Sequence, residues 1–551
     1  MQPQNYSEPK IFNFSFAEFI RPYSLDENYK FAKKDNACVV LDGSRVIFAS
    51  EMERHTKLKH DYKAPTFALD AFKKYSGLPW ANHVRDFTLD INPKQHNHHN
   101  NHIYECFYQS GFSQAAVLVN DCFGNNNDAI TLAYMKEGEA PVILKKFSSS
   151  ASPCHAYCAA SIHAFGNNFS EGKLMGLAAY GKNNGKQYIR WNSSSKSIET
   201  DEQLLLNDIK TSQNAHDKQA TLAQIFDVVP ESSKQRHAMI TRDVAYTIQK
   251  NFEDTLVEVA KHLKELLEGR GIQTSNLCMS GGGILNCLTN SRIINLGLFK
   301  HYYASPQPGD GCAQSIGRAL WNLETSGEKL KSTKLKTAYL GVTYPASKLP
   351  FPRTHLKHPI SQLCSYLQNG NVLAWFQDGA EYGPRALGHR SFLADPSKPN
   401  MLTKLNTLKG REQWRPLAPI VPDRLFNLLF DVSNTDMCEF MLRTLHIREK
   451  WQSMLQAVCH VDGTTRPQLL KRETNPELYD ILITYYEQTG VPCLVNTSLN
   501  INGFPIVETP CDVCDLSEEI ACMQTSVPQV NTIFIEHGKF YEVHQKPVQK
   551  R

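Results

Sequence analysis

Four histidines lie within seven residues of this chain, in the segment HNHHNNH at 96–102. The apolar spacing of the residues that follow is compatible with a helix, so His98 and His102 would lie one turn apart on one face, where two imidazoles can reach one metal ion. A solvated histidine-rich loop explains the segment about equally well by itself. Asp121 favours the metal site, because a carboxylate at the end of the apolar strand AAVLV is costly unless it meets a cation or hydrogen-bond donors.

A further carboxylate comes from the segment PQPGDGCAQSIG at 306–317. Asp310 stands there between glycines, just before a predicted helix. Its carboxylate could complete the metal site, or it could simply cap the helix N-terminus, as aspartate commonly does.

Two glycine-containing segments are candidates for contact with a nucleotide. SGGGILN at 280–286 follows a short predicted strand, and its glycines let backbone amides approach a phosphate or a ribose. SEGKLMGLAAYG at 170–181 precedes and enters a helix-prone run. Either segment is also plausible as a tight structural turn, and composition does not decide between the two readings. The candidate nucleotide-binding residues are Glu171, Lys173, Gly176, Gly281, Gly282 and Asn286.

Basic side chains gather beside glycine and proline in three later segments, DGAEYGPRALGHRS at 378–391, LKGREQWRPLAP at 408–419 and HVDGTTRPQ at 460–468. Because they sit in turns rather than along a polar helix face, the pattern favours fixed geometry around an anion, and guanidinium forks fit phosphate and carboxylate oxygens in pairs. Surface salt bridges could account for any one of these residues, but they account poorly for the whole set. The set is Arg385, Arg390, Lys409, Arg411, Arg415 and Arg466.

Two similar hairpins are predicted in the first part of the chain, at 37–50 and at 115–135, each with an acidic residue and a glycine at its turn. Duplicated hairpins of this kind suit a two-lobed nucleotide-binding fold. Apolar residues recur every three or four positions over 241–268, which predicts a long helix, and the strand NLCMS then runs into the glycines. A stretch rich in Lys, Ser, Thr and Pro places a domain boundary near residue 335.

Composition is that of an ordinary globular protein. The 551 residues suggest two to four domains, 41% are hydrophobic and 21% charged, and the formal net charge is only +4. No apolar stretch is long enough to span a membrane and the first ten residues are polar, so a cytoplasmic location is expected. The odd count of 15 cysteines, spread through apolar contexts, favours reduced thiols without structural disulfides.

Several strings resemble the signatures of one enzyme family, the nodulation protein U and tobramycin carbamoyltransferase family, also called the cephem carbamoyltransferase family. They appear in the family's order between residues 171 and 507, and GPRALGHRS followed by the Trp-Arg-Pro segment is the most specific. The full set is EGKLMGLAAYG, SGGGILNC, DGAEYGPRALGHRSFLADP, REQWRPLAP, HVDGTTRPQ and NTSLNINGFPIV.

The resemblance implies an α/β protein with two domains. Residues 1–335 would form an actin-like (ASKHA, RNase H-like duplicated) domain that binds metal and nucleotide and carries out carbamoyl transfer, and residues 336–551 a YrdC-like α/β domain. Carbamoyl phosphate would bind in the second domain, and its carbamate would join the α-phosphate of ATP to give carbamoyladenylate. One divalent ion (Fe, Mn or Zn, with Mg possible alongside ATP) would orient the adenylate in the first domain while an acceptor hydroxyl attacks its carbonyl.

The residue assignments that the resemblance implies fall into three groups. The metal ligands would be His98, His102, Asp121 and Asp310, and the nucleotide would be bound by the six residues named above. Carbamoyl phosphate would be bound by Arg385, Arg390, Lys409, Arg415, Arg466 and Asn496.

This chain departs from the family pattern at three places. Lys34 occupies the position of the family's histidine, the base for the acceptor hydroxyl, and a lysine can act as base only with a strongly lowered pKa. Cys312 stands where a family glycine is expected after Asp310. NTSLNINGFPIV lacks the arginine and glutamate that the family often places there, so one carbamoyl phosphate contact would be missing or replaced.

Two alternative functions compete with the hypothesis of an O-carbamoyltransferase. One is a tRNA threonylcarbamoyl transferase, because the two halves resemble the two activities of that pathway. The other is a catalytically inactive nucleotide-binding partner, which the lost histidine makes credible. The expected partners are carbamoyl phosphate, ATP and a hydroxyl-bearing acceptor (a small molecule, a sugar or a modified nucleotide), with no membrane. The sequence leaves the acceptor and the oligomeric state open, a homodimer being one option.

Overall fold

The computed structural model describes residues 10–14, 37–58, 66–75, 86–88, 97–124, 127–165, 170–214, 232–522 and 528–544. Helices and strands alternate along the chain, so the protein is of the predicted α/β class. Lys34 lies outside the described residues, and its role as a base stays a prediction.

The first sheet confirms the hairpin predicted at 37–50. Its strands run in the order β3-β2-β1-β4, antiparallel from β1 to β3 and parallel between β1 and β4. Gly43 takes a positive φ of 56° at the hairpin turn. The bounds are β1 Lys10–Phe14, β2 Ala37–Asp42, β3 Arg45–Glu51 and β4 Asp86–Thr88, with helices α1 Met52–Thr56 and α2 Thr66–Tyr75.

The second sheet repeats this pattern and adds a strand, in the order β11-β10-β5-β6-β7. Here β5, β6 and β7 are antiparallel, while β10 runs parallel to both β5 and β11. The hairpin predicted at 115–135 is therefore confirmed. The bounds are β5 Gln114–Asn120, β6 Asp128–Lys136, β7 Val142–Ser148, β10 Asn276–Ser280 and β11 His301–Tyr303.

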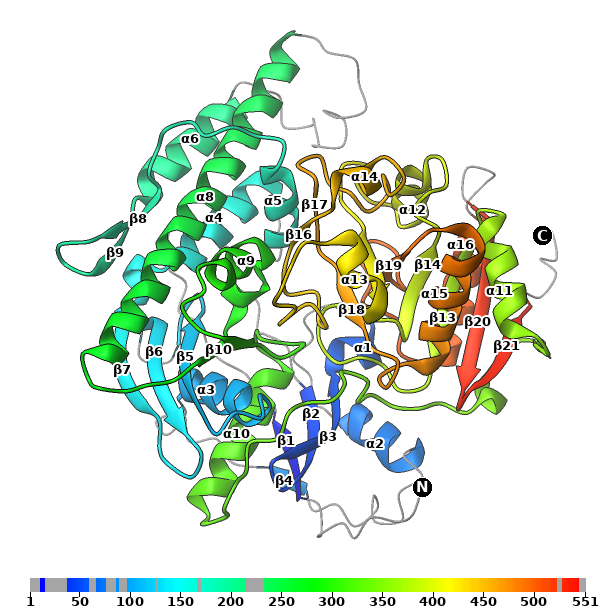
Figure 1. The fold of residues 1–551 in the computed structure, drawn as a ribbon, viewed down its shortest axis with the longest axis horizontal. Coiled ribbons are helices and arrows are strands. Elements are labelled where there is room, and N and C mark those ends of the chain that lie inside the picture. The colour runs from blue at the N-terminus through cyan, green and yellow to red at the C-terminus, as the bar shows by residue number, and fades with distance from the viewer. Residues whose placement is uncertain are drawn as a thin grey trace.

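Helices cover this second sheet on both sides (Figure 1), α3 on one and α8 with its neighbours on the other, and α10 packs against α3 and the first sheet. The periodic segment 241–268 lies within α8, which begins earlier, and its apolar positions from Val244 to Leu263 are buried as the periodicity predicts. The bounds are α3 His98–Tyr108, α4 Pro153–Phe165, α5 Glu171–Ala178, α6 Glu202–Asn214, α8 Ser232–Glu268, α9 Cys287–Asn295 and α10 Cys312–Thr325, with a small hairpin of β8 Ile189–Asn192 and β9 Ser197–Thr200.

The remainder of the chain is built on an eight-stranded mixed sheet in the order β12-β21-β20-β13-β14-β19-β15-β18. Its strands are β12 Arg353–His355, β13 Val372–Gln377, β14 Arg390–Ala394, β15 Ala418–Pro422, β18 Gln468–Leu470, β19 Leu494–Ser498, β20 Val530–Glu536 and β21 Lys539–Val543. Around it lie α11 Pro359–Gln368, α12 Met401–Leu408, α13 Asp423–Leu429, α14 Glu449–Gln452, α15 Pro476–Thr489 and α16 Pro510–Cys522, and the short pair β16 Leu445–His446 and β17 Thr464–Thr465.

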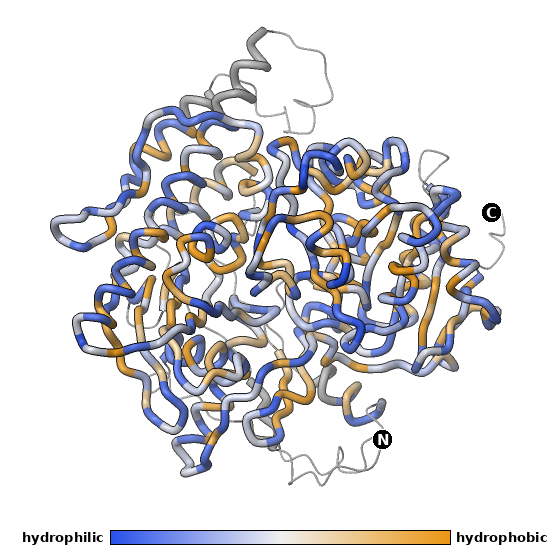
Figure 2. Tube along the Cα trace, viewed as in Figure 1, coloured by the Kyte–Doolittle hydropathy of each residue, from blue (hydrophilic) through white to orange (hydrophobic). Residues whose placement is uncertain are grey.

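Two large apolar cores form, and the first sheet contributes to both. Val39 and Leu41 of β2 face the core of the five-stranded sheet, whereas Cys38 and Val40 on the opposite face join the core of the eight-stranded sheet. In Figure 2 the strands of the eight-stranded sheet are largely hydrophobic and the outer loops largely hydrophilic. Since the first sheet belongs to both cores, the domain boundary near 335 stays a prediction.

Of the helices in the described part of the chain, none combines the length and the apolar character that crossing a bilayer requires.

Candidate functional site

The structure brings the four predicted metal ligands together. His98 and His102 project from the first two turns of α3, Asp121 follows β5, and Asp310 precedes α10. Asn97 starts α3, since its side chain accepts a hydrogen bond from the backbone N–H of Asn100. One ligand atom from each of the four residues lies within 4.8 Å of the others.

The donor set suits a divalent cation. His98 Nε2 is 3.0 Å from Asp121 Oδ2 and 3.2 Å from Asp310 Oδ1, and 3.3 Å separates it from His102 Nε2. Burial lowers the pKa of His98, but the charges of Asp310 and Asp121 outweigh it and raise the pKa to about 10. The buried carboxylate of Asp121 and the half-buried carboxylate of Asp310 therefore need a positive charge, which either a proton on His98 or a metal ion can supply. Two imidazoles with two carboxylates are typical ligands of iron, manganese and zinc.

A hydrogen-bond chain fixes the orientation of His102. Its Nδ1 lies 2.9 Å from Ser280 Oγ, and that hydroxyl donates to Glu105 Oε2 at 3.0 Å. Burial raises the pKa of the fully buried Glu105 carboxyl to about 8. Such outer partners set the tautomer and the ring orientation of a ligand histidine.

Gly281 and Gly282, predicted to contact a nucleotide, lie beside the metal ligands. Gly281 has a φ of +99°, and a Cβ there would stand 2.3 Å from the carbonyl oxygen of Asn120. A Cβ on Gly282 would stand 3.3 Å from Asp121 Oδ1. Asn286, in contrast, caps α9 and exchanges two hydrogen bonds with Gln249. The glycines thus border the candidate metal site, whereas Asn286 supports the helix that follows.

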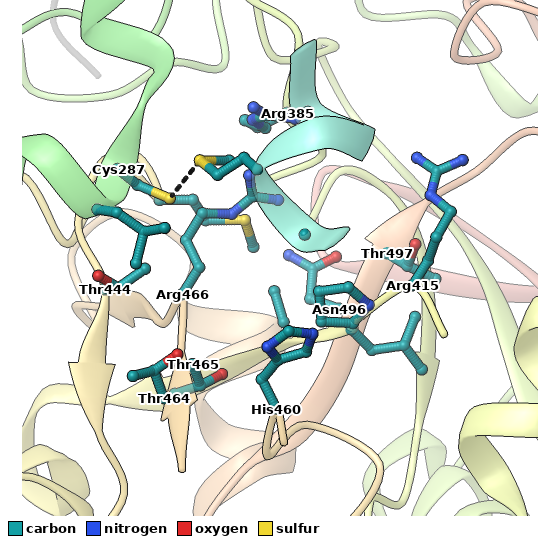
Figure 3. A pocket seen from close by; sticks show the side chains of 18 of the residues that line it. Cys287, Arg385, Arg415, Thr444, His460, Thr464, Thr465, Arg466, Asn496 and Thr497 are labelled. Atoms are coloured by element: carbon teal, nitrogen blue, oxygen red, sulfur yellow. Dashed lines mark hydrogen bonds between the residues drawn. The ribbon is translucent and has the colours of Figure 1, made fainter. Parts of the chain in front are cut away.

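A second site is a pocket of about 220 Å³ lined from both sides of residue 335. Gly172 and Gly176 of α5 and Cys287 of α9 contribute one wall, and the loops and strands around the eight-stranded sheet contribute the rest. Figure 3 shows Arg385, Arg415, Arg466 and Asn496 around this space. Its charged and polar lining residues include Arg385, Arg411, Arg415, His460, Asp462, Thr465, Arg466 and Asn496.

The guanidinium groups of this pocket are half-buried and lie close together. Burial and the charge of Arg466 lower the pKa of Arg385 to about 9, and burial and the charge of Arg415 do the same for Arg411. Within the described part of the chain, Nε of Arg385 and of Arg466 has no hydrogen-bond partner. Several neighbouring guanidinium groups favour the binding of an anion with several acceptor oxygens.

Asn496 offers the pocket an acceptor. Its Nδ2 donates to the carbonyl of Ala386 at 3.0 Å and to Gln468 Oε1 at 2.7 Å. Its buried Oδ1 has no partner among the residues that the structure describes. An amide N–H donor on a bound ligand would satisfy this oxygen.

Two of the predicted carbamoyl phosphate residues do not line the pocket. Arg390 is fully buried and donates to the backbone carbonyls of Gln377 and Asp378, with its guanidinium 3.5 Å from the ring of Phe376. The ammonium group of Lys409 contacts the carbonyl oxygens of Ser498 and Asn500. Both cations therefore hold backbone segments together, and the structure brings only Arg385, Arg415, Arg466 and Asn496 of the predicted set to the pocket.

The predicted nucleotide segment of α5 reaches this same pocket. Gly176 lines it, and a Cβ there would stand 3.3 Å from the ring of Trp414. Lys173 instead pairs with Glu412 at 2.8 Å, and Glu171 lies in the first turn of α5 without lining the pocket.

Sequence reasoning missed His460 and Asp462, which also line the pocket. The signal was present, because both belong to the segment HVDGTTRPQ that supplied Arg466. A histidine two residues from an aspartate carries little information until the turn is seen to face the arginines.

Comparison with known proteins identifies the family. Residues 86–320 match the family model described as Carbamoyltransferase N-terminus, and residues 364–531 match Carbamoyltransferase C-terminus. The chain belongs to the carbamoyltransferase family. Its membership makes it a transferase enzyme, as the signature strings predict.

Relatives of this carbamoyltransferase include two that extend over most of the chain. Nodulation protein NolNO of Sinorhizobium fredii is 27% identical over 90% of this chain and 78% of its own length. An uncharacterized protein of Synechocystis sp., sll1178, is 30% identical over 77% and 74%. The 3'-hydroxymethylcephem-O-carbamoyltransferase of Amycolatopsis lactamdurans is 35% identical over 45% of this chain and 46% of its own length.

These matches favour a carbamoyltransferase over the two alternatives raised by the sequence, a tRNA threonylcarbamoyl transferase and an inactive nucleotide-binding partner. Among solved structures, HypF of T. kodakarensis aligns with a TM-score of 0.27 and 14% identity, over 46% of this chain and 39% of that one, a likeness that bears no argument about the reaction.

Proposed function

We propose that this carbamoyltransferase joins carbamoyl phosphate and ATP into carbamoyladenylate and then transfers the carbamoyl group to an acceptor hydroxyl. The observation that carries the proposal is the pocket lined by Arg385, Arg411 and Arg466, each of which has a buried guanidinium nitrogen without a hydrogen-bond partner among the residues that the structure describes. A phosphate group offers the oxygens that guanidinium forks need, and a carbamoyl NH2 offers a donor to Asn496 Oδ1.

The proposed reaction has three steps. Water cleaves carbamoyl phosphate to carbamate and inorganic phosphate. A carbamate oxygen then attacks the α-phosphorus of ATP, forming carbamoyladenylate and releasing pyrophosphate. Finally the acceptor oxygen attacks the carbamoyl carbon, AMP leaves, and the hydroxyl proton passes to a base.

The second and third steps belong, in this proposal, near His98, His102, Asp121 and Asp310. These side chains would hold one divalent ion, which supplies positive charge to the phosphate oxygens of the nucleotide when bound. Gly281 and Gly282 keep the backbone beside these ligands free of side chains, which supports close approach of a nucleotide phosphate. The segment from Gly282 to Cys287 runs from this site to the arginine pocket.

The fold supports a division of this work between two domains. The repeated order of an antiparallel three-stranded meander followed by a parallel strand, seen in both N-terminal sheets, supports an actin-like duplicated domain. The mixed eight-stranded sheet would be the YrdC-like domain. We place the boundary near 335, with the arginine pocket between the two.

The acceptor is proposed only as a class. A small molecule, a sugar or a modified nucleotide with a free hydroxyl fits the reaction, and the printed name of the Amycolatopsis relative supports a hydroxymethyl group. The base that takes the acceptor proton would be Lys34, or a residue of the acceptor site that replaces it.

Mass spectrometry of the reaction without an acceptor tests the proposal. Metal-replete protein with carbamoyl phosphate and ATP should yield carbamoyladenylate, pyrophosphate and phosphate in equal amounts. If ATP and carbamoyl phosphate both remain intact, the proposed reaction is wrong. Intact-mass screening of hydroxyl compounds for the carbamoyl increment would then identify the acceptor.

A double variant tests the metal site by composition rather than by activity. His98→Ala with His102→Ala removes both nitrogen ligands, and elemental analysis should find that a stoichiometric divalent ion is lost. His301→Ala, which changes an exposed histidine at the start of β11, is the matched control and should keep the ion. Unchanged metal content in the double variant would leave the four residues as a buried ion-pair cluster.

A further inference from the structure

The turn that carries Arg466 also presents an imidazole and a carboxylate to the arginine pocket. His460 and Asp462 both line the pocket, and His460 Nδ1 lies 3.7 Å from Asp462 Oδ1. Figure 3 shows His460 and Arg466 extending into the same space. The three side chains therefore face whatever anion the arginines bind.

Hydrogen bonds within the turn hold the pair in place. Asp462 Oδ1 accepts from the backbone N–H of Thr464 at 2.9 Å and from its hydroxyl at 2.7 Å. The backbone N–H of His460 donates to the carbonyl of Thr464, also at 2.9 Å. Gly463 supplies the positive φ of 76° that the turn requires. Burial opposes ionisation of Asp462, but the nearby His460 ring and the hydrogen bonds from Thr464 outweigh it and lower its pKa to about 2.

The other ring nitrogen of His460 is available to a ligand. Nε2 is buried and has no hydrogen-bond partner among the residues that the structure describes. The ring packs edge-on against Tyr180, with centroids 5.4 Å apart at 89°, so its direction is fixed. Nδ1 faces the Asp462 carboxylate, an arrangement that favours the tautomer in which Nε2 keeps its lone pair.

Few other lining groups can accept a proton. The remaining ionisable groups of the pocket are the arginines, which are cations, and Cys287, whose sulfur contacts that of Met175 at 3.8 Å. An imidazole is the side chain that most often takes up a proton near neutral pH.

We propose that His460 is the general base that activates water for the cleavage of carbamoyl phosphate, with Asp462 as its positioning residue. This inference rests on the proposed function and assigns its first step to a residue. A water O–H proton passes to Nε2 of His460, the water oxygen bonds to the carbonyl carbon, and the bond from that carbon to the phosphate oxygen breaks. Phosphate leaves with the bonding electrons among the arginines and takes up the proton held by His460, which regenerates the base. The carbamic acid then releases its acidic proton to solvent to give carbamate.

The experiment measures phosphate release by the full-length, metal-replete protein with carbamoyl phosphate and ATP. His460→Gln should lower kcat for phosphate release by roughly 100-fold to 10,000-fold. Its affinity for phosphonoacetamide, an analogue with a CH2 in place of the bridging oxygen, should change by less than about threefold in titration calorimetry. His460→Ala should regain part of the lost rate when free imidazole is added. Asp462→Asn should lower kcat while leaving KM unchanged.

His446→Gln is the matched control, because His446 is an exposed histidine on β16, the strand paired with β17. It should retain the full rate. If His460→Gln releases phosphate at a rate within about threefold of wild type, His460 is not the base, and the proposed carbamoyl transfer is unaffected. A fall in rate with an equal fall in phosphonoacetamide affinity would make His460 a binding residue and overturn its role as base. If the wild-type protein itself releases no phosphate, the proposed function fails and the inference fails with it.

Discussion

At the scale of single residues, the pocket arginines differ in how they are partnered. Arg415 Nη1 lies 3.6 Å from Glu412, whereas Nε of Arg466 has no partner among the residues described. We expect Arg466→Ala to remove a charge-assisted contact worth about 1.5 to 3 kcal/mol, so the KM for carbamoyl phosphate should rise roughly tenfold to a hundredfold in steady-state kinetics. Arg415→Lys should not keep full activity, since an ammonium cannot replace a planar fork.

The same Arg466→Ala protein should still transfer the carbamoyl group from synthetic carbamoyladenylate, because that intermediate bypasses the anion pocket. Arg424→Ala, which changes an exposed arginine paired with Glu487, is the control and should leave KM unchanged. Equal loss of transfer from carbamoyl phosphate and from preformed adenylate, in a folded variant, would refute the assignment of Arg466.

Glu105 makes stability depend on pH in an unusual direction. Burial raises the pKa of this carboxyl from 4.5 to about 8, so between these values the unfolded chain releases a proton that the folded protein keeps. Stability then falls as pH rises through this window, by at most about 1.4 kcal/mol per pH unit, and the loss is constant above the folded pKa.

Glu105→Gln removes this titration. In urea unfolding of chelator-treated protein, the variant should gain stability relative to wild type by a few kcal/mol between pH 5 and pH 8. A difference between the two proteins that is the same at both pH values would mean that Glu105 ionises normally in the fold.

At the scale of elements, helices α3 and α10 touch along their backbones. A Cβ on Gly317 of α10 would stand 1.9 Å from the carbonyl oxygen of Asn101 on α3. Gln314 joins the same helices, accepting from Asn101 Nδ2 at 2.9 Å and donating to the carbonyl of His98. Because α3 carries His98 and His102, the spacing of these helices positions the candidate metal site.

We expect Gly317→Ala to push the helices apart and to lower the free energy of unfolding by about 1 to 3 kcal/mol or more, as overpacking does. Metal affinity should fall as well, which a competition titration with a chelating dye can measure. Gly172→Ala is the control for stability, because no atom lies within 4 Å of its added Cβ and alanine favours a helix. Full stability and metal affinity in Gly317→Ala would show that the helix contact has room to adjust.

At the scale of the whole molecule, Trp414 joins the two sides of the predicted boundary. It is 5% exposed, stacks near Phe165 of α4 with centroids 6.5 Å apart, and accepts a hydrogen bond at its carbonyl from the hydroxyl of Tyr180. Trp414 lies between Arg411 and Arg415 in the sequence, so the packing of its ring helps to position the loop that carries both arginines.

Trp414→Ala should lower the free energy of unfolding by about 3 to 5 kcal/mol, the usual cost of emptying a buried aromatic site. It should also raise the KM for carbamoyl phosphate, since the arginine loop loses its anchor. Lys173→Met removes the partly exposed pair with Glu412 and a cation contact with the Phe165 ring, and should cost below about 1 kcal/mol. If the two variants lose equal stability by chemical unfolding, packing at Trp414 does not hold the two sides together.

The sequence by itself predicted many of the elements and the four residues of the candidate metal site. Both hairpins, the long helix and the strand before the glycines follow from local patterns of apolar residues and turn residues, which depend on neighbours in the chain. His98 and His102 could be paired in the same way, because one helical turn sets their separation. That Asp121 and Asp310 join them was predicted from the resemblance, and the structure places them there.

The roles of the basic residues were decided only by the tertiary structure. Arg385, Arg390 and Lys409 look alike in sequence, since each stands beside glycine in a turn, or two residues from one. Arg390 and Lys409 meet carbonyl oxygens of other segments and hold the backbone, whereas Arg385 meets Arg466 across a pocket. Whether a cation is neutralised by the backbone or left for a ligand depends on which distant segments pack against it. For the same reason only the folded chain could show that α5 and His460 share the arginine pocket.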